Sequence, residues 1–208
     1  MELKEPLRYV FHVIVRPFDG FWDLKHEKRG SLAAAAVILA IVMFTVVLRY
    51  PLSGFAVMIV NWEYFNIFRV LLNSLIPFML WCASNWCLTT LMDGKGSFKD
   101  IFIASSYALA PYALINIPLI AVSNVITGNE YVFYAFFYYL AEIWCVGLML
   151  AAMMMTHEYS FGKAIFSSLL TLVGIGIMVF LFMIFFSLIS DSAAYFIALY
   201  KEISFRFY

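Results

Sequence analysis

Five long apolar runs dominate the chain, and each is long enough to form a membrane-spanning helix. The runs cover residues 32–48, 70–92, 101–126, 131–155 and 164–189. A hydrocarbon layer about 30 Å thick is crossed by roughly 17–25 residues of helix. The runs are continuously apolar rather than alternating, and backbone amides in lipid need partners within their own segment. The pattern therefore predicts an all-α, polytopic integral membrane protein with a five-helix domain over residues 32–189.

The segment before the first run, residues 1–31, has the pattern of a helix that lies on the membrane surface. Phe18, Phe21 and Trp22 fall on one helical face, just after a proline that suits a helix start. The polar side is supplied by Asp19, Asp23, Lys25, Glu27, Lys28 and Arg29. We therefore expect residues 17–28 to form an interfacial helix roughly perpendicular to the spans, with its aromatic side chains toward lipid or the end of the bundle.

The tail after the last run, residues 190–208, mixes aromatic and aliphatic side chains with Lys201 and Arg206. That mixture is typical of a helix at a membrane surface. The tail is therefore expected to form a second surface segment, on the outer side of the membrane.

The distribution of Lys and Arg predicts the orientation of the chain. Nine of the thirteen lie in residues 1–31 and in the loops 93–100 and 156–163, all on one side of the predicted membrane. Basic residues are enriched in cytoplasmic segments. We therefore expect a multi-pass protein of the plasma (inner) membrane, with the N-terminus in the cytoplasm and the C-terminus outside.

Composition supports a membrane protein and excludes several other classes. Apolar residues make up 65% of the chain and charged residues 12%, against about 45–50% and 25% in an ordinary soluble domain. The 13 Lys and Arg balance the 13 Asp and Glu, so net charge gives no support for a nucleic-acid partner. The lipid bilayer is the expected partner.

A shift of 63 residues aligns the second and third runs with the fourth and fifth without a gap. The aligned pairs are Trp81-Cys82 with Trp144-Cys145, Ser97-Phe98 with Ser160-Phe161, and Ser105 with Ser168. A duplication would relate two parallel hairpins by a pseudo-twofold axis along the membrane normal. The alternative is the shared composition of membrane helices.

Glu142 is the one formally charged residue inside the five runs. An ionised carboxylate at this depth costs several kcal/mol unless it is paired or protonated. Its depth, about 16 Å from the outer end of its helix at 1.5 Å per residue, matches Asn116 and Asn73 better than Arg69. With Tyr107, these residues are candidates for a ligand or ion site. The alternative is a protonated Glu142 and polar side chains that join helices by hydrogen bonds.

The sequence contains none of the common catalytic motifs: no H-E-x-x-H, G-x-S-x-G, P-loop or GxGxxG. We therefore expect no enzymatic activity and no cofactor. His157 and Glu158 follow three methionines, but no second His or Cys stands at ligand spacing, so no metal site is predicted. Lys95 and Lys99 in the 93–100 loop either hold an anion near the start of the third span or meet lipid headgroups.

Two stretches, RPFDGFWDLKHEKRG at 16–30 and DGKGSFKDIFIASSYALAPYAL at 93–114, resemble the bacterial branch of the YIP (Ypt/Rab-interacting protein) membrane family. The shared features are a proline-aromatic lead-in, a G-x-x-S-F loop and a Y-x-x-x-P element. In this chain the last two are formed by Gly94, Ser97, Phe98, Tyr107 and Pro111. The resemblance implies five helices with the N-terminus inside and the C-terminus outside.

For function, the same resemblance implies an accessory membrane protein without an assigned reaction. Eukaryotic members engage small GTPases of vesicle traffic through an acidic N-terminal sequence that is not evident here. Bacterial members are sometimes found near sugar-uptake components, which makes a sugar-uptake system one of the partners that the resemblance suggests.

Two functional hypotheses follow. The first is a non-enzymatic membrane scaffold or accessory protein that binds another membrane protein or its own copy as a homo-oligomer. Its contact surface would be the 16–30 helix and the 93–100 loop, with Phe18, Phe21 and Trp22 as the apolar anchors. The second is a small transporter or channel with a site near Glu142 and Asn116.

Overall fold

The structure, a computed structural model, describes residues 4–207, and every element in that part of the chain is helical. The helices are α1 (Lys4–Val15), α2 (Pro17–His26), α3 (Leu32–Leu52), α4 (Ile67–Leu91), α5 (Phe98–Ala108), α6 (Ala110–Ser123), the 3-10 helix η1 (Gly128–Glu130), α7 (Tyr131–His157) and α8 (Phe161–Phe207). Five segments are long and apolar enough to cross a membrane: α3, α4, α5 with α6, α7, and α8. The predicted all-α fold with five candidate spans is confirmed.

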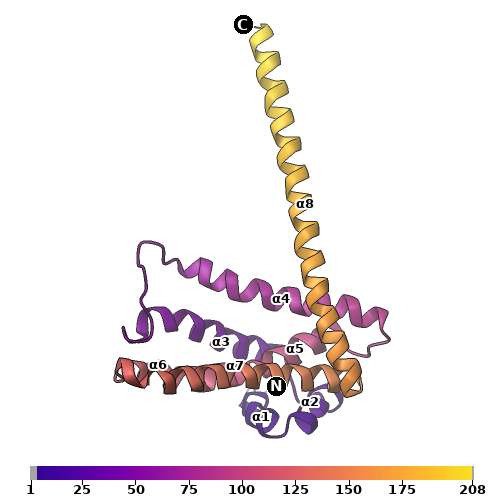
Figure 1. The fold of residues 1–208 in the computed structure, drawn as a ribbon. Coiled ribbons are helices and arrows are strands. Elements are labelled where there is room, and N and C mark those ends of the chain that lie inside the picture. Colours follow the sequence, from indigo (N-terminus) through magenta and orange to yellow (C-terminus); the bar gives the residue numbers. More distant parts are fainter. Residues whose placement is uncertain (1–3, 208) are drawn as a thin grey trace.

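Helices α3, α4, α6 and α7 run side by side, and α1 and α2 lie below them near the start of α8 (Figure 1). The largest apolar cluster joins α1, α2, α3, α5 and α7. Val13, Phe21 and Tyr107 are almost fully buried within it. The N-terminal helices are therefore part of the packed core and not a free extension.

The helix predicted over 17–28 forms as α2, which ends at His26. Lys28 follows with φ of 52°, a left-handed conformation that a continuing helix does not allow. Ser31 then caps α3, because its hydroxyl accepts a hydrogen bond from the Ala34 N–H at 3.1 Å. The residues between α2 and α3 thus turn the chain into the first span.

The third predicted span, 101–126, is divided at Leu109 into α5 and α6. Pro111 causes the break, since it lacks an N–H and its ring would clash with the carbonyl four residues earlier. The N–H groups beside it bond over three residues instead of four: Leu109 to the Ser106 carbonyl and Tyr112 to the Leu109 carbonyl.

Helix α8 runs without interruption for 47 residues. The tail 190–208, expected as a separate surface segment, continues this helix as far as Phe207, because no Gly or Pro after Gly176 ends it. At 1.5 Å per residue α8 is about 70 Å long, more than twice the thickness of the hydrocarbon layer. It leaves the bundle crosswise to α4 and α7 (Figure 1).

The 63-residue shift relates α4 to α7, and α5 with α6 to the first half of α8, and helices of one hairpin pack on helices of the other. Helix α8 packs mainly on α4, and its counterpart α5 packs on α7, the counterpart of α4. The aligned Cys82 and Cys145 are both buried. This pairing agrees with a duplication, although α6 stays against α7 whereas the second half of α8 departs from α4.

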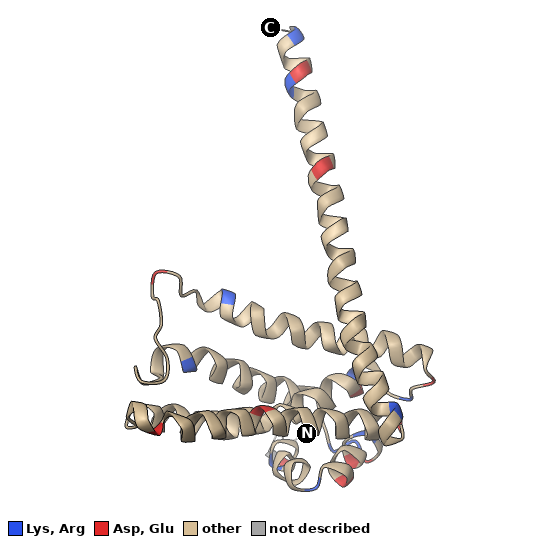
Figure 2. Ribbon diagram, in the orientation of Figure 1, with Lys and Arg blue, Asp and Glu red and all other residues tan. Residues whose placement is uncertain are grey.

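Charged residues gather where α1, α2 and the 92–97 loop meet, whereas few lie at the opposite end of the bundle (Figure 2). We call the first the basic end and the second the distal end. Besides the 53–66 loop and η1, the distal end carries two arginines, Arg49 near the end of α3 and Arg69 near the start of α4.

Candidate functional site

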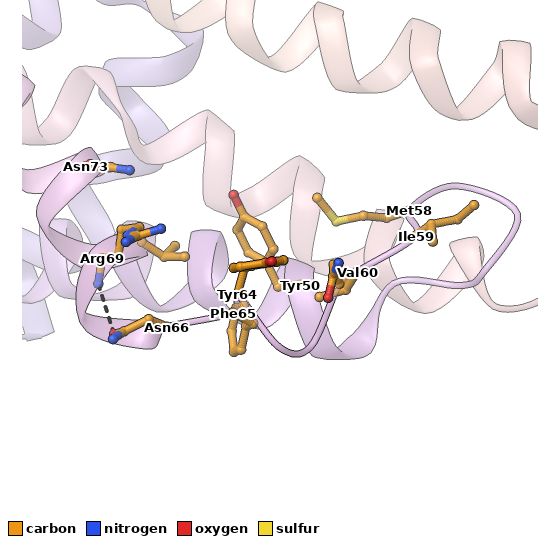
Figure 3. A pocket seen from close by; sticks show the side chains of 11 residues that line it. Tyr50, Met58, Ile59, Val60, Tyr64, Phe65, Asn66, Arg69 and Asn73 are labelled. Carbon is orange, nitrogen blue, oxygen red and sulfur yellow. Dashed lines mark hydrogen bonds between the residues drawn. The ribbon is translucent and has the colours of Figure 1, made fainter.

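Two adjoining cavities open at the distal end of the bundle. The first, about 230 Å³, lies between the 53–66 loop and the start of α4. The second, about 330 Å³, extends along α3, α6 and α7. Tyr50 and Met58 line both cavities, so the two adjoin, and we call the pair of cavities the distal hollow. In the first cavity, the rings of Tyr50 and Tyr64 lie between Arg69 on one side and Met58 on the other (Figure 3).

Arg49 lines the second cavity and rests on an aromatic face. Its guanidinium carbon lies 3.9 Å from the ring centroid of Tyr138, a cation–π contact. Its Nε is buried without a hydrogen-bond partner. Among the described residues, no carboxylate oxygen lies within 4 Å of its nitrogens. Arg49 therefore supplies a fixed positive charge with at least one unused donor.

The start of α4 supplies the polar side of the first cavity. Asn66 caps the helix, because its side-chain oxygen accepts hydrogen bonds from the N–H groups of Phe68 at 2.9 Å and Arg69 at 3.3 Å. The bond to Arg69 is the dashed line in Figure 3. The Arg69 side chain is exposed, lines the cavity with Asn73, and forms no ion pair with any described carboxylate.

Glu142 lies in the second cavity with Arg49, Tyr112 and Tyr138 in its lining. Depth along the helices predicts Asn116 and Asn73 as its neighbours, and neither of them lines this cavity. Residue depth gives a position along the membrane normal, but it does not say which helices are adjacent. Because α3 and α7 both pack against α6, Arg49 reaches the cavity of Glu142.

The other predicted ligand residues occupy separate places. Asn116 is 1% exposed and donates from Nδ2 to the Tyr112 carbonyl at 2.9 Å. Tyr107 is fully buried and donates its hydroxyl to the Pro6 carbonyl at 3.0 Å, which anchors α1. Asn73 lines the first cavity. The structure therefore does not bring Glu142, Asn116, Tyr107 and Asn73 together around one space.

A cluster of ion pairs forms at the basic end around Glu158, the residue that ends α7. Glu158 has φ of 57°, a conformation usually taken by Gly or Asn at this position. Its carboxylate lies 2.5 Å from Lys95 Nζ and 3.3 Å from Lys25 Nζ. The hydrogen bond from Lys95, followed by that from Lys25, lowers the pKa of Glu158 to about 2. Glu158 thus ties α2 and the 92–97 loop to the end of α7.

The lowered pKa predicts how this cluster responds to pH. Because folding favours the ionised form of Glu158, its contribution is present above pH 4.5, the ordinary carboxyl value, and is lost as the pH falls toward 2. We expect the Glu158→Gln variant to exchange amide hydrogens in α2 faster than the wild type at pH 6. The difference should narrow as the pH falls from 4.5 toward 2. Equal protection of α2 in both proteins at pH 6 would contradict the prediction.

A buried polar network lies just inside this cluster. The Gly96 N–H donates to His157 Nδ1 at 3.3 Å, so the proton of the neutral ring is on Nε2, which donates to Asn85 Oδ1 at 3.1 Å. Asn85 Nδ2 donates to Met153 Sδ at 2.7 Å and lies 3.5 Å from Thr171 Oγ1. The network joins α4, α7, α8 and the 92–97 loop. Sequence reasoning treated His157 alone, because its partner lies 72 residues away.

Most of the chain matches a known protein family. Residues 11–184 match the Yip1 domain. The chain belongs to the Yip1 domain family. Comparisons with curated proteins and with solved structures gave no match. The match confirms the resemblance to the YIP family and, with the five apolar helices, makes the protein a multi-pass membrane protein whose surface meets the lipid bilayer.

The Yip1 domain contains both the distal hollow and the network at the basic end, and it ends within α8. The second half of α8 beyond residue 184 extends past the matched region. The sequence features that resemble the family in α2 and the 93–100 loop therefore lie at the basic end. Arg49 and Arg69 of the distal hollow belong to none of the motifs in the sequence analysis.

The residues predicted as an interface within the Yip1 domain have different surroundings. Phe21 is 1% exposed, whereas Phe18 is 52% and Trp22 45% exposed. The cations also divide: Lys25 and Lys95 pair with Glu158 and Arg29 pairs with Glu27, whereas Lys28 and Lys99 are exposed and take part in none of the ion pairs of the described residues. Much of the predicted surface is thus used inside the molecule.

Proposed function

We propose that this Yip1 domain protein is a non-enzymatic membrane scaffold that binds another membrane protein or a second copy of itself, with α8 as its main contact surface. The observation that carries the proposal is the exposure of α8. Every residue from Phe180 to Arg206 is exposed. Between Phe180 and Ile189 the only polar residue of the helix is Ser187, and such an apolar stretch is typical of a helix surrounded by lipid or by other helices and not of one lying on a surface.

A second feature of the same helix supports a protein partner over lipid alone. Where α8 departs from α4, the two helices enclose a wedge of about 920 Å³. Its lining is entirely apolar and includes Leu75, Met79 and Phe182. Helices in a bilayer associate by close packing, and a concave apolar surface between two rigid helices offers more packing area than a single convex helix.

The proposal also covers the orientation of the chain and its membrane. The excess of Lys and Arg at the basic end supports a cytoplasmic N-terminus in a plasma membrane. On this reading Phe18, Trp22, Lys28 and Lys99 face the cytoplasmic interface and contribute contacts with lipid headgroups. Labelling of cysteines placed at Lys28 and in the 53–66 loop with a membrane-impermeant reagent tests this, since the loop alone should react from outside.

Photo-crosslinking in native membranes tests the scaffold. A crosslinking residue at Phe182 should give a reproducible adduct with one membrane protein or with a second copy of the chain. The same residue at Phe133, which is 71% exposed on α7, serves as the matched control and should not. A chain that is monomeric in mild detergent and gives no adduct from α8 would count against the proposal.

The alternative, a small transporter or channel, has support from the cavity that Glu142 shares with Arg49. It requires a polar path that continues to the basic end, and Asn116 and Tyr107 bond to backbone carbonyls instead of extending the cavity. Flux of ions or protons in reconstituted vesicles that the Glu142→Gln variant abolishes would favour the transporter over the scaffold.

A further inference from the structure

The distal hollow holds a combination of groups that the scaffold does not use. Two arginines line it, one in each of its two cavities, and neither has a carboxylate within 4 Å among the described residues. We propose that the distal hollow is a binding site for a phosphate-bearing anion, with Arg49 and Arg69 as its principal ligands.

Arg49 is prepared for such a ligand by its surroundings. Its guanidinium is held over the Tyr138 ring at 3.9 Å, which fixes the plane of the group while leaving its N–H edges free to donate. The buried Nε has no hydrogen-bond partner among residues 4–207. A buried donor without a partner destabilises the protein, so an anion that accepts a hydrogen bond from this edge relieves a cost already present in the unliganded protein.

The rest of the lining favours an anion over a cation. Asn66 uses its side-chain oxygen to cap α4, so that acceptor is withdrawn from the first cavity. Asn73 and the hydroxyls of Tyr50 and Tyr64 add hydrogen-bonding groups beside Arg69. A guanidinium fork matches the oxygens of a phosphate, and two forks from different helices hold one anion at several points.

Glu142 decides where in the hollow the anion sits. It lines only the second cavity, together with Arg49, and it lies about 16 Å inside the end of α7. In its ionised form Glu142 repels a phosphate from the deeper part of the cavity. The phosphate group therefore lies toward Tyr50 and Met58, where the cavity lined by Arg69 adjoins the cavity lined by Arg49.

Two kinds of molecule carry such a phosphate group: an anionic phospholipid, in its headgroup, and free inorganic phosphate. Binding would be measured with the full chain by two probes. In nanodiscs of phosphatidylcholine with or without phosphatidylglycerol, native mass spectrometry counts retained anionic lipid. In delipidated detergent solution, thermal unfolding with and without inorganic phosphate measures stabilisation by the free ion.

We expect the wild type to respond to at least one probe, and each of Arg49→Gln and Arg69→Gln to weaken that response about tenfold, the effect of losing one charge-assisted bond. Arg8→Gln, which removes an exposed arginine at the basic end, is the matched control and should leave the response unchanged. Retention of phosphatidylglycerol without a phosphate effect identifies the lipid headgroup, and stabilisation by phosphate identifies the free ion.

Because Arg49 stacks on Tyr138, its removal also affects the packing of α3 on α7. The exposed Arg69 does not have that role, so Arg69→Gln with wild-type helical content and unfolding temperature is the decisive variant. If neither probe separates this folded variant from the wild type, the proposal is overturned. The scaffold tested at α8 is independent of this result, since α8 contributes no residue to the distal hollow.

Discussion

Replacing Phe21 by Ser is expected to release α1 and α2 from the bundle while the five spans stay inserted. Phe21 is 1% exposed within the largest apolar cluster, which also contains Leu24, Ala151 and Ala152. Truncation of a buried Phe costs about 3–5 kcal/mol, and the serine hydroxyl adds a buried polar group without a designed partner. Docking of α2 is local, so the loss falls on this segment.

Amide exchange of residues 17–26 measures the release of α2, and proteolysis at Lys25 and Arg29 provides an independent readout. Phe18→Ser is the matched control on the same helix, because Phe18 is 52% exposed, and a surface change of this kind is usually within about 0.5 kcal/mol. Trp22→Ser should also have a small effect, since Trp22 is 45% exposed and stacks only on the His26 ring at 3.8 Å. Equal effects of Phe18→Ser and Phe21→Ser would show that α2 is not docked as described.

Replacing Asn85 by Leu is expected to give the second large loss of stability. The substitution removes the acceptor of the His157 Nε2–H and the contact to Thr171, so a buried donor is left without a partner. That cost is about 1–3 kcal/mol, above the roughly 0.6 kcal/mol average for a polar contact between membrane helices, because Asn85 serves several partners. The unfolding temperature in detergent should fall, and exchange in the 92–97 loop should rise.

Two further variants test whether the lower unfolding temperature comes from the unpaired His157 Nε2–H or from the change of Asn to Leu in general. Asn73→Leu makes the same chemical change at an exposed position of α4 and should leave the unfolding temperature close to that of the wild type. In the double variant Asn85→Leu with His157→Leu, the orphaned Nε2–H is removed but the Gly96 N–H loses its acceptor, so the double variant should lose less stability than the two single variants added together. Stability losses of Asn85→Leu and His157→Leu that simply add in the double variant would contradict the role given to the bond between Asn85 and His157.

The positions of the N-terminal aromatics illustrate what a helical period can and cannot predict. Spacings of three and four residues place Phe18, Phe21 and Trp22 on one broad face. Only the docking of α2 against α5 and α7 decides that Phe21 enters the core while Phe18 and Trp22 stay at the surface. The period identifies a face, whereas burial depends on how the neighbouring helices meet it.

The surroundings of Glu142 could not be predicted for a related reason. Its position in α7 gives its depth, and depth favoured Asn116 and Asn73. Arg49 lies 93 residues earlier in the chain and shares its cavity because α6 brings α3 and α7 together. No spacing in the sequence carries information about that adjacency.

The class of the protein follows from its sequence: apolar runs in a chain with few charges require lipid as solvent, and runs that are continuous instead of alternating form helices there, because backbone groups in lipid must be bonded internally. Local features that depend on neighbouring residues also follow from it, such as the start of α2 at Pro17. The tertiary structure alone decided which polar side chains meet, including Asn85 with His157 and Arg49 with Tyr138. It also decided the course of α8. Spanning segments are stable through their own backbone bonds, so their packing is set by contacts between residues far apart in the chain.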